Sequence, residues 1–403
     1  MKMKSQQKTE LGPVGRSRRA LLFSLGGLGT VTATFGVHST LFYKSLNDPS
    51  ASSPLYNGQI LSDVRQCAID SGFNHQTVAK DVVKRLNLTG KNVVITGGHS
   101  GTGREAVRAL AGTGATIIAL ARDVRRAREN LRGIPNTEIE YVDLLEPSLI
   151  DTFTAKFVKS GRPLHILVNS AGIMGTPLQR DTRGYERQFA TNVLGHFQLT
   201  VGMIPSLERA NGARIINLSS RGHRAGNVNF DDINFEHTEY SGMRAYAQTK
   251  TALALFSVKL DEMLRGRNIR AFAVHPGPVP STDLFAAGRV GFEPQYLVDL
   301  ARFNAMVVRA THQTELLNFV RKPENIGDLY KTVQQGGATT AWAATSPDLD
   351  RKGGLYLEDC NIAVVVPNGS SAPFGVRPWA LDGESASRLW VACEKMTGVC
   401  FRT

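Results

Sequence analysis

The sequence predicts an α/β protein built on a doubly wound parallel sheet. Three observations predict this fold class: short runs rich in Val, Ile and Leu recur along the chain, helical patterns separate most of them, and a glycine-rich loop and a helix follow the first run at once. Near-continuous apolar strands are typical of parallel sheets that helices cover on both faces. An apolar content of 42% and a charged content of 20% suit a globular chain and exclude a disordered or fibrous one.

Seven strands are expected, in an order that helical segments interrupt. They occupy residues 93–96, 116–120, 138–142, 165–168, 214–218, 270–274 and 355–357. Although 403 residues would suit two or three domains, this single alternation predicts one catalytic domain over residues 88–403. Crossovers between parallel strands are right-handed, and ligands bind at the carboxyl ends of the strands, where the strand order reverses.

Residues 1–44 differ from the rest of the chain in charge. They hold seven basic residues and Glu10 as the sole acid, a net +6 that is half of the formal +12 of the protein. Residues 20–43 contain no charged side chain and follow Arg18 and Arg19, as in a twin-arginine export signal or a membrane anchor. We therefore expect export or membrane association, rather than a cytoplasmic protein; a buried helix of the main domain is the less favoured alternative. The folded domain shows no basic stripe that would predict a nucleic-acid partner.

Residues 45–87 are expected to lead from this segment into the domain. Asn, Asp, Pro and Ser dominate residues 45–58, as in a linker, and residues 60–86 are compatible with one or two amphipathic helices. The four cysteines form no C-x-x-C pair and have no interleaved histidines, so no metal site is expected. In an exported chain Cys393 and Cys400 are candidates for a disulfide.

The loop after the first strand has the spacing G-x-x-x-G-x-G. Glycines permit a sharp turn and the close approach of a phosphate, and the free amides at the start of the next helix attract a pyrophosphate. We predict a dinucleotide site here, with an ordinary structural turn as the alternative. The expected contacts come from Thr96, Gly97, His99, Ser100, Gly101, Thr102 and Gly103.

The second strand ends at Arg122 and Asp123. An acidic residue at this place accepts hydrogen bonds from the ribose of NAD, whereas an arginine pairs with the additional phosphate of NADP. Arg122 therefore predicts a preference for NADP(H), with NAD(H) as the alternative because Asp123 follows, and His99 is expected to contact the same phosphate. The nearby Arg125, Arg126 and Arg128 are interpreted as a solvated helix face.

Tyr246 and Lys250 lie four residues apart in a helical stretch, so both side chains share one face. A lysine ammonium beside a phenol favours the phenolate, and we expect the pKa of Tyr246 to be lowered toward neutrality. Ser220, which follows the strand at residues 214–218, supplies a hydroxyl for the substrate oxygen. A general acid or base with a hydrogen-bonding partner is therefore predicted, against the alternative of a surface helix pair.

The chain carries three further motifs: Asn169-Ser-Ala-Gly172, Thr-Asn192-Val-Leu-Gly and Pro276-Gly277. Together with the glycine loop, Ser220 and the Tyr246–Lys250 pair, they resemble the short-chain dehydrogenase/reductase family over about residues 88–285. The resemblance implies a Rossmann fold and a catalytic tetrad of Asn192, Ser220, Tyr246 and Lys250. In that family the tyrosine exchanges a proton as hydride moves to or from C4 of the nicotinamide, and the asparagine holds a water for a relay through the lysine. Ser219 is the weaker candidate for the catalytic serine.

The resemblance also implies the remaining cofactor contacts. Adenine would meet Asp143, and Asn169 would steady the sheet beside the cofactor. Two departures from the family pattern are Ser170 in place of an asparagine and the added Pro280, which leaves Ser281 or Thr282 to contact the carboxamide. The contacts implied by the resemblance are those of Asp143, Leu144, Asn169, Ala171, Gly172, Tyr246, Lys250, Pro276, Gly277, Val279 and Ser281.

Ala-Val-His275-Pro-Gly and Leu355-Tyr-Leu-Glu-Asp-Cys360 are similar to the branch of retinol dehydrogenases and WW-domain oxidoreductases, which act on lipophilic alcohols and carbonyls. Residues 284–332 carry aromatic and aliphatic side chains at helical spacing, where the family has its substrate lid. His223 and Met174 are further expected to line the pocket. The predicted function is NADP(H)-dependent oxidoreduction of a lipophilic alcohol or carbonyl. The alternatives are an NAD(H)-dependent dehydrogenase of a small alcohol and a non-catalytic nucleotide-binding scaffold, and a homo-oligomer remains open.

Overall fold

The computed structural model describes residues 65–284, 314 and 330–401 of the chain. The expected signal or anchor and most of the expected lid lie outside these described residues. Among the residues that are described, no helix is long and apolar enough to cross a membrane.

The centre of the molecule is one sheet with the strand order β3-β2-β1-β4-β5-β6-β7-β8. The strands are β1 (Asn92–Thr96), β2 (Thr116–Ala121), β3 (Thr137–Tyr141), β4 (Ile166–Asn169), β5 (Ala213–Leu218), β6 (Ile269–His275), β7 (Leu355–Glu358) and β8 (Asn361–Ile362). The first seven are parallel, and they match the seven predicted strands to within one residue at most ends. The doubly wound α/β fold is thereby confirmed.

The last strand, β8, was not predicted. It pairs antiparallel with β7 through a two-residue turn in which Asp359 and Cys360 have φ values of 52° and 56°. Positive φ at both central residues is the geometry of a tight hairpin turn, which usually takes Asn or Gly. A strand of two residues is too short to show an alternating hydrophobic pattern, and Asp-Cys is not a typical hairpin turn sequence. No local pattern therefore predicted β8.

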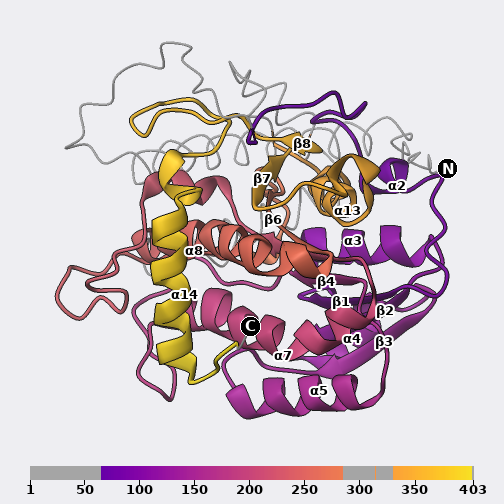
Figure 1. Ribbon diagram of the computed structural model, residues 1–403, viewed down its shortest axis with the longest axis horizontal. Coiled ribbons are helices and arrows are strands. Elements are labelled where there is room, and N and C mark those ends of the chain that lie inside the picture. The colour runs from indigo at the N-terminus through magenta and orange to yellow at the C-terminus, as the bar shows by residue number, and fades with distance from the viewer. Residues whose placement is uncertain (1–64, 285–313, 315–329, 402–403) are drawn as a thin grey trace, which may run out of the picture.

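Helices cover both faces of the sheet (Figure 1). One face is covered by α2 (Ala79–Val82), α3 (Gly101–Ala111), α12 (Val333–Gly336) and α13 (Ala338–Thr345), and the other by α5 (Pro147–Lys159), α7 (Gly195–Arg209), α8 (Gly242–Leu264) and α14 (Gly383–Thr397). Strand β1 shows why both layers are needed. Val93 and Ile95 are buried in the first layer and Val94 in the second, so every residue of the strand interior is apolar.

Short elements connect these layers. They are α4 (Val124–Asn130), α6 (Arg187–Phe189), the π-helical turn η1 (Ala190–Leu194), and the 3₁₀ turns η2 (Arg221–Ala225), η3 (Arg265–Arg267), η5 (Pro347–Leu349) and η6 (Pro378–Ala380). Helix α4 lies beside β3, and η2 lies against α8. The elements η1 and η2 hold residues that the sequence predicted to be catalytic or pocket-lining.

Helix α14 packs across α8 near the carboxyl terminus of the chain (Figure 1). The carboxylate of Asp382 caps its start by accepting from the Ser385 amide at 2.7 Å, and Gly398 ends it in the left-handed region at φ 72°. The Trp390 ring lies 5.0 Å from Phe197, edge to face, and 6.0 Å from Phe256. This aromatic cluster fixes α8, the helix that carries Tyr246 and Lys250, from outside.

The segment that leads into the domain is part of its packed structure. Gln66 is 3% exposed, and its amide nitrogen donates to the carbonyl oxygens of Tyr356 and Ala363, each at 2.7 Å. Its side-chain oxygen accepts from the Tyr356 amide at 3.0 Å. The start of this segment therefore packs against β7, and α2 packs against α3 and α13. One or two amphipathic helices were expected over residues 60–86, and within the described part of that stretch, from residue 65 on, the short α2 is the one helix.

The strand order reverses between β1 and β4, which both lead into loops at the same edge. Thr96 joins these loops, because its hydroxyl oxygen accepts from the amides of Ser170 at 2.9 Å and Ala171 at 3.0 Å. Open parallel sheets bind ligands at such a reversal.

Candidate active site

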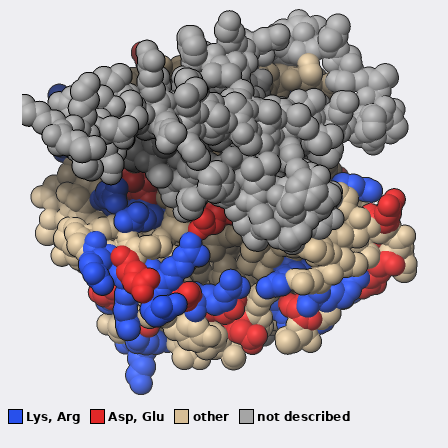
Figure 2. Space-filling model, turned by 180° about the vertical axis from the view of Figure 1, so that it is seen from behind, with Lys and Arg blue, Asp and Glu red and all other residues tan. Residues whose placement is uncertain are grey.

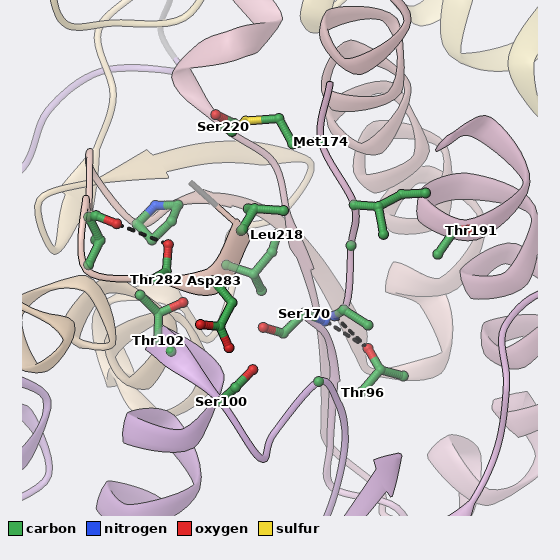
Figure 3. A pocket seen from close by; sticks show the side chains of 18 of the residues that line it. Thr96, Ser100, Thr102, Ser170, Met174, Thr191, Leu218, Ser220, Thr282 and Asp283 are labelled. Atoms are coloured by element: carbon green, nitrogen blue, oxygen red, sulfur yellow. Dashed lines mark hydrogen bonds between the residues drawn. The ribbon is translucent and has the colours of Figure 1, made fainter. Parts of the chain in front are cut away.

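A cavity of about 590 Å³ opens at the carboxyl ends of the strands. Ser100, Thr102 and Asp283 lie at one end of it, and Ser220 and Met174 lie at the other (Figure 3). The predicted site residues that line it are Thr96, Gly97, His99, Ser100, Gly101, Thr102, Arg122, Asp143, Leu144, Ala171, Gly172, Met174, Ser220, Tyr246, Lys250, Pro276, Gly277 and Val279. Gly103, Asn169, Asn192, Ser281 and His223 were expected at this site and do not line the cavity.

The glycine loop requires its glycines. Gly97 has φ 66°, and a Cβ there would lie 2.9 Å from the Cα of Ala171. A Cβ on Gly103 would lie 2.6 Å from the carbonyl oxygen of Gly97, so Gly103 packs behind the loop instead of facing the cavity. Ser100, at the start of α3, makes no side-chain capping bond, which leaves the first amides of the helix for another partner. These features fit a pyrophosphate, and the residues that would hold it are those of the loop from Gly97 to Gly103.

The end of β2 carries the groups expected to choose between NAD and NADP. Arg122 and Asp123 are both exposed and line the cavity. One oxygen of Asp123 accepts from the Arg126 amide at 2.9 Å and so caps α4. The Nδ1 atom of His99 is buried without a hydrogen-bonding partner, and burial, followed by the charge of Arg126, lowers the pKa of this histidine. A neutral imidazole beside two arginines suits a phosphate as a partner.

Arg126 also lines the cavity, although the sequence suggested only a solvated helix face. Its guanidinium forms an ion pair with Asp283, and each side chain is about half exposed. Asp283 lies 157 residues away in the chain, beside Thr282 at the cavity wall. Sequence spacing carried no signal for this contact, because only the fold brings α4 and the loop after β6 together.

The loop after β3 contributes Asp143 and Leu144 to the cavity, as the resemblance implied. A carboxylate oxygen of Asp143 accepts from the Leu145 amide at 3.0 Å, which orients the side chain. Thr191 and Thr176 line the cavity as well, and the hydroxyl oxygen of each is buried without a partner. Thr176 belongs to none of the motifs in the sequence, and Thr191 was missed although it opens the motif that contains Asn192.

Asn169 does not reach the cavity. It is fully buried, and its amide nitrogen donates to the Thr200 hydroxyl at 2.9 Å and to the Asn217 side chain at 2.8 Å. These bonds brace β4 against β5 and α7, which agrees with the steadying role that the resemblance gave it. The neighbouring Ser170, the departure from the family pattern, takes the place on the cavity wall.

Ser220, Tyr246 and Lys250 meet on the cavity wall opposite the glycine loop. The Ser220 hydroxyl oxygen accepts from the Gly222 amide at 3.1 Å, and the Ser220 side chain is near enough to the Tyr246 phenol to lower the pKa of that phenol. The Nζ atom of Lys250 lies 5.4 Å from the centroid of the Tyr246 ring and donates to the Leu218 carbonyl at 2.6 Å. Tyr246 is 3% exposed and Lys250 4%, so both groups act out of water.

The expected lowering of the Tyr246 pKa is wrong for the protein groups alone. Burial raises the pKa of Tyr246 to about 12, and the hydrogen bond with Ser220 opposes this only in part. The same burial lowers the pKa of Lys250 to about 7, so that this lysine is not a permanent cation near the phenol. Desolvation outweighs the ammonium effect that the i, i+4 spacing suggested.

Asn192 lies in η1 and braces the loop after β4 instead of facing the cavity. Its side-chain oxygen accepts from the Ile173 amide at 2.9 Å, while its nitrogen donates to the Ile173 carbonyl at 2.9 Å and to the Thr249 hydroxyl at 3.1 Å. Its backbone carbonyl lies 2.8 Å from Nδ1 of the buried His196. π-Helical turns recur at functional sites, and the water relay through Lys250 stays a prediction.

Ser219 and Ser220 have different partners. Both line the cavity, but the Ser219 hydroxyl donates to the backbone carbonyl of Lys250 at 2.7 Å, whereas the Ser220 side chain lies beside Met174 (Figure 3). The proton of Ser219 is therefore already used, which favours Ser220, and the catalytic role of the second serine stays a prediction.

The loop after β6 follows a path that the added Pro280 made hard to predict. Gly277 has φ 83°, and a Cβ there would meet the side chain of Lys331 at 2.5 Å. Thr282 lines the cavity and donates to the Val279 carbonyl at 2.9 Å, while Ser281 is buried away from it. Of the two candidates for the carboxamide contact, Thr282 is therefore the one on the cavity wall, and the contact itself stays a prediction.

The substrate end of the cavity is apolar. Met174, Met243 and Tyr246 form a buried cluster against which Leu284 packs. Met174 therefore lies where it was predicted. His223 does not: it is fully buried behind Ser220, where it contacts Tyr356 and Arg377. Its position one turn after the serine put it on the wrong side of η2.

Charged side chains of both signs share the described part of the surface in Figure 2. Several are paired, such as Arg162 with Glu138 at 2.8 Å and Lys156 with Glu140 at 2.8 Å. Such pairs neutralise basic residues locally.

Comparisons with known proteins agree with this geometry. Residues 91–289 match the family described as short chain dehydrogenase. A Streptomyces lividans protein named "Probable oxidoreductase" is 35% identical over 313 residues, covering 76% of this chain and 97% of the relative. Retinol dehydrogenase 13 of Mus musculus is 30% identical over 321 residues, covering 78% and 86%.

Solved structures show the same fold. An uncharacterized protein from Mycobacterium paratuberculosis is 27% identical with a TM-score of 0.57, covering 80% of this chain and 98% of that one. The Pseudomonas aeruginosa RhlG/NADP active-site complex is 20% identical with a TM-score of 0.50, covering 68% and 95%, which shows the fold alone. The chain therefore belongs to the short-chain dehydrogenase/reductase family, in its retinol-dehydrogenase-like branch, and is an NAD(P)-dependent oxidoreductase that interconverts an alcohol and a carbonyl.

Proposed function

We propose that the protein transfers a hydride between NADP(H) and a lipophilic alcohol or carbonyl compound, with Tyr246 as the general acid or base. One observation carries this proposal: Ser220, Tyr246 and Lys250 line the same cavity as the glycine loop and Arg122. A non-catalytic scaffold would need the glycine loop and could lack the hydroxyl groups opposite it. Because Ser220, Tyr246 and Lys250 are all present opposite the glycine loop, the cavity supports an enzyme.

The bound dinucleotide supplies or accepts the hydride at its nicotinamide ring. The protein supplies the proton, and Tyr246 is its source because a phenol with a pKa of about 12 remains protonated at neutral pH. Ser220 accepts from the Gly222 amide, so its own proton is available to the substrate oxygen. These properties favour carbonyl reduction, in which Tyr246 donates its proton as the carbonyl becomes an alcohol.

The side chains of two arginines and one histidine support a preference for NADP(H). Arg122 lies exposed at the end of β2, His99 has a buried nitrogen without a partner, and Arg126 lies on the first turn of α4. Together they offer a phosphate more donors than the ribose of NAD requires. Asp123 uses one of its oxygens to cap α4, which weakens the case for NAD(H).

The apolar end of the cavity supports a lipophilic substrate. Ile173, Met174, Pro278, Leu284 and Tyr330 are among the residues that line the cavity, and Met174 and Leu284 pack together with Met243 and Tyr246. Apolar walls with a few convergent hydroxyl groups are typical of sites for lipophilic small molecules.

A substrate panel with both cofactors tests the proposal. We expect purified protein to oxidise NADPH with retinoid aldehydes or steroid ketones, at a kcat/KM at least about tenfold above that with NADH. Short polar carbonyls such as glyceraldehyde serve as the control. Preference for NADH and small alcohols would establish the first alternative, and nucleotide binding without turnover of any substrate would establish the scaffold.

We further propose that residues 20–43 export the protein or hold it at a membrane. The support is the uncharged run after Arg18 and Arg19, which lies outside the described residues. Cell fractionation with N-terminal sequencing tests this proposal, and a full-length protein in the soluble cytosol contradicts it.

A further inference from the structure

Two side chains behind the cavity connect Ser220 with strand β7. His223 and Tyr356 are both fully buried, and their rings lie 4.7 Å apart between η2 and β7. Neither lines the cavity, so neither has a part in the chemistry described above. Each nevertheless forms hydrogen bonds to residues adjoining the catalytic groups.

The position of the His223 proton follows from its neighbours. Its Nε2 atom lies 3.2 Å from the backbone N–H of Arg377, which can only donate, so Nε2 is the acceptor. Burial lowers the pKa of His223 to about 3, so the ring is neutral and its single proton is on Nδ1. That atom lies 2.8 Å from the Ser220 carbonyl and 3.0 Å from the Tyr356 hydroxyl. The histidine therefore donates to both oxygens.

The network has a fixed direction. The Arg377 backbone N–H donates to Nε2 of His223, and the Nδ1 N–H of His223 donates to the Ser220 carbonyl, with the Tyr356 hydroxyl as its second acceptor. The bonds thus run in one direction, from Arg377 through His223 to Ser220 and Tyr356. The Ser219 hydroxyl separately donates to the Lys250 carbonyl at 2.7 Å.

We propose that His223 and Tyr356 are positioning residues, which hold Ser220 in place against β7 through this buried chain of hydrogen bonds. The inference rests on the proposed role of Ser220 in the reaction. Both ends of the chain are backbone groups with fixed polarity, so no member can reverse its bond without leaving a buried group unpaired.

The backbone of His223 is held as firmly as its ring. Its carbonyl oxygen accepts from the indole nitrogen of Trp379 at 3.1 Å. The Thr251 hydroxyl lies 3.1 Å from the same oxygen and 2.6 Å from the Gly226 carbonyl, its shorter acceptor. Thr251 follows Lys250 on α8, and Trp379 belongs to η6. The loop that carries Ser220 is therefore tied to α8, β7 and η6 at one residue.

Two substitutions of His223 separate its two nitrogen atoms. An asparagine places an N–H near the position of Nδ1, and a glutamine places an oxygen near the position of Nε2. We expect His223→Asn to keep kcat within about threefold of the wild type and His223→Gln to lower it at least about tenfold, because only the former retains the donor to Ser220. The affinity for NADPH, measured by fluorescence, should stay within about twofold in both, because the glycine loop is untouched.

Tyr356→Phe provides a second variant that keeps the ring and removes the hydroxyl. It should lower kcat at least about tenfold with little change in NADPH affinity. Thr113→Val is its matched control, because Thr113 is also a buried residue whose hydroxyl donates to a carbonyl, that of Leu110 at 2.6 Å, away from the cavity. The control should lower the melting temperature and leave kcat unchanged.

Equal kcat values in His223→Asn and His223→Gln, or wild-type kcat in Tyr356→Phe, would overturn the positioning role. Ser220→Ala distinguishes this from a failure of the proposed function. If Ser220→Ala has wild-type kcat, the proposed role of Ser220 is wrong; if it is inactive while the His223 and Tyr356 variants are normal, only the positioning role is wrong.

Discussion

The two ends of the cavity are built in different ways. The phosphate end consists mainly of backbone: glycines whose missing side chains make room, open amides at the start of α3, and the exposed Arg122 and Asp123. The catalytic end consists of buried side chains, with Tyr246 at 3% and Lys250 at 4% exposure. Shape selects the ligand at the first end, and desolvation tunes reactivity at the second. Substitutions should therefore change affinity at one end and turnover at the other.

The largest effect is expected at the catalytic end, from Tyr246→Phe. Removal of the phenolic hydroxyl eliminates the proton donor and should lower kcat about a thousandfold. The ring still fills its place among Met174 and Met243, so NADPH affinity should stay close to that of the wild type. Steady-state kinetics with a fluorescence titration of NADPH measures both quantities, and substantial residual turnover would refute the assignment.

At the phosphate end the largest effect is expected from Gly103→Val. Its Cβ would lie 2.6 Å from the Gly97 carbonyl and displace the loop. We expect NADPH affinity to fall about tenfold to a hundredfold, because overpacking of this size costs about 1–3 kcal/mol. Gly266→Ala is the control, since a Cβ at Gly266 has no neighbour within 4 Å. Unchanged NADPH affinity in Gly103→Val would show that the glycine loop is not part of the cofactor site.

Arg122→Ala should have a smaller effect and change selectivity. Loss of a charge-assisted hydrogen bond to the additional phosphate should raise KM for NADPH about tenfold and leave KM for NADH nearly unchanged. Arg125→Ala is the matched control, because Arg125 lies three residues further along, on α4, with 86% of its side chain exposed. Equal changes with both cofactors would show that Arg122 does not read the phosphate.

The smallest effect concerns stability. Burial lowers the pKa of Lys250 from 10.5 to about 7, so between these values the unfolded chain binds a proton that the folded chain does not. Stability therefore rises with pH across this range, and the cost of burying Lys250 is complete below pH 7. Lys250→Met should abolish turnover yet raise the melting temperature by a few degrees at pH 6 to 7, an advantage that disappears near pH 10. A variant less stable than the wild type at pH 6 would contradict the burial cost.

The comparison also explains what the sequence could predict. The strands, the glycine loop and the Tyr246–Lys250 pair follow from local patterns, because each lies within a few residues of chain. The ion pair of Arg126 with Asp283 joins residues 157 apart, and the contact of His223 with Tyr356 joins residues 133 apart. The sign of the Tyr246 pKa shift failed for the same reason, since spacing reveals a neighbouring charge but not the burial that outweighs it.

Gln66 sets a limit on how the chain can be shortened. Its three hydrogen bonds clamp the amino-terminal edge of the domain to Tyr356 and Ala363, and Tyr356 also contacts His223 behind Ser220. If the proposed leader is removed during export, the cut has to fall before this glutamine to leave the clamp in place. The shortest chain that keeps the clamp therefore begins at or before Gln66, 26 residues ahead of the first strand of the sheet at Asn92.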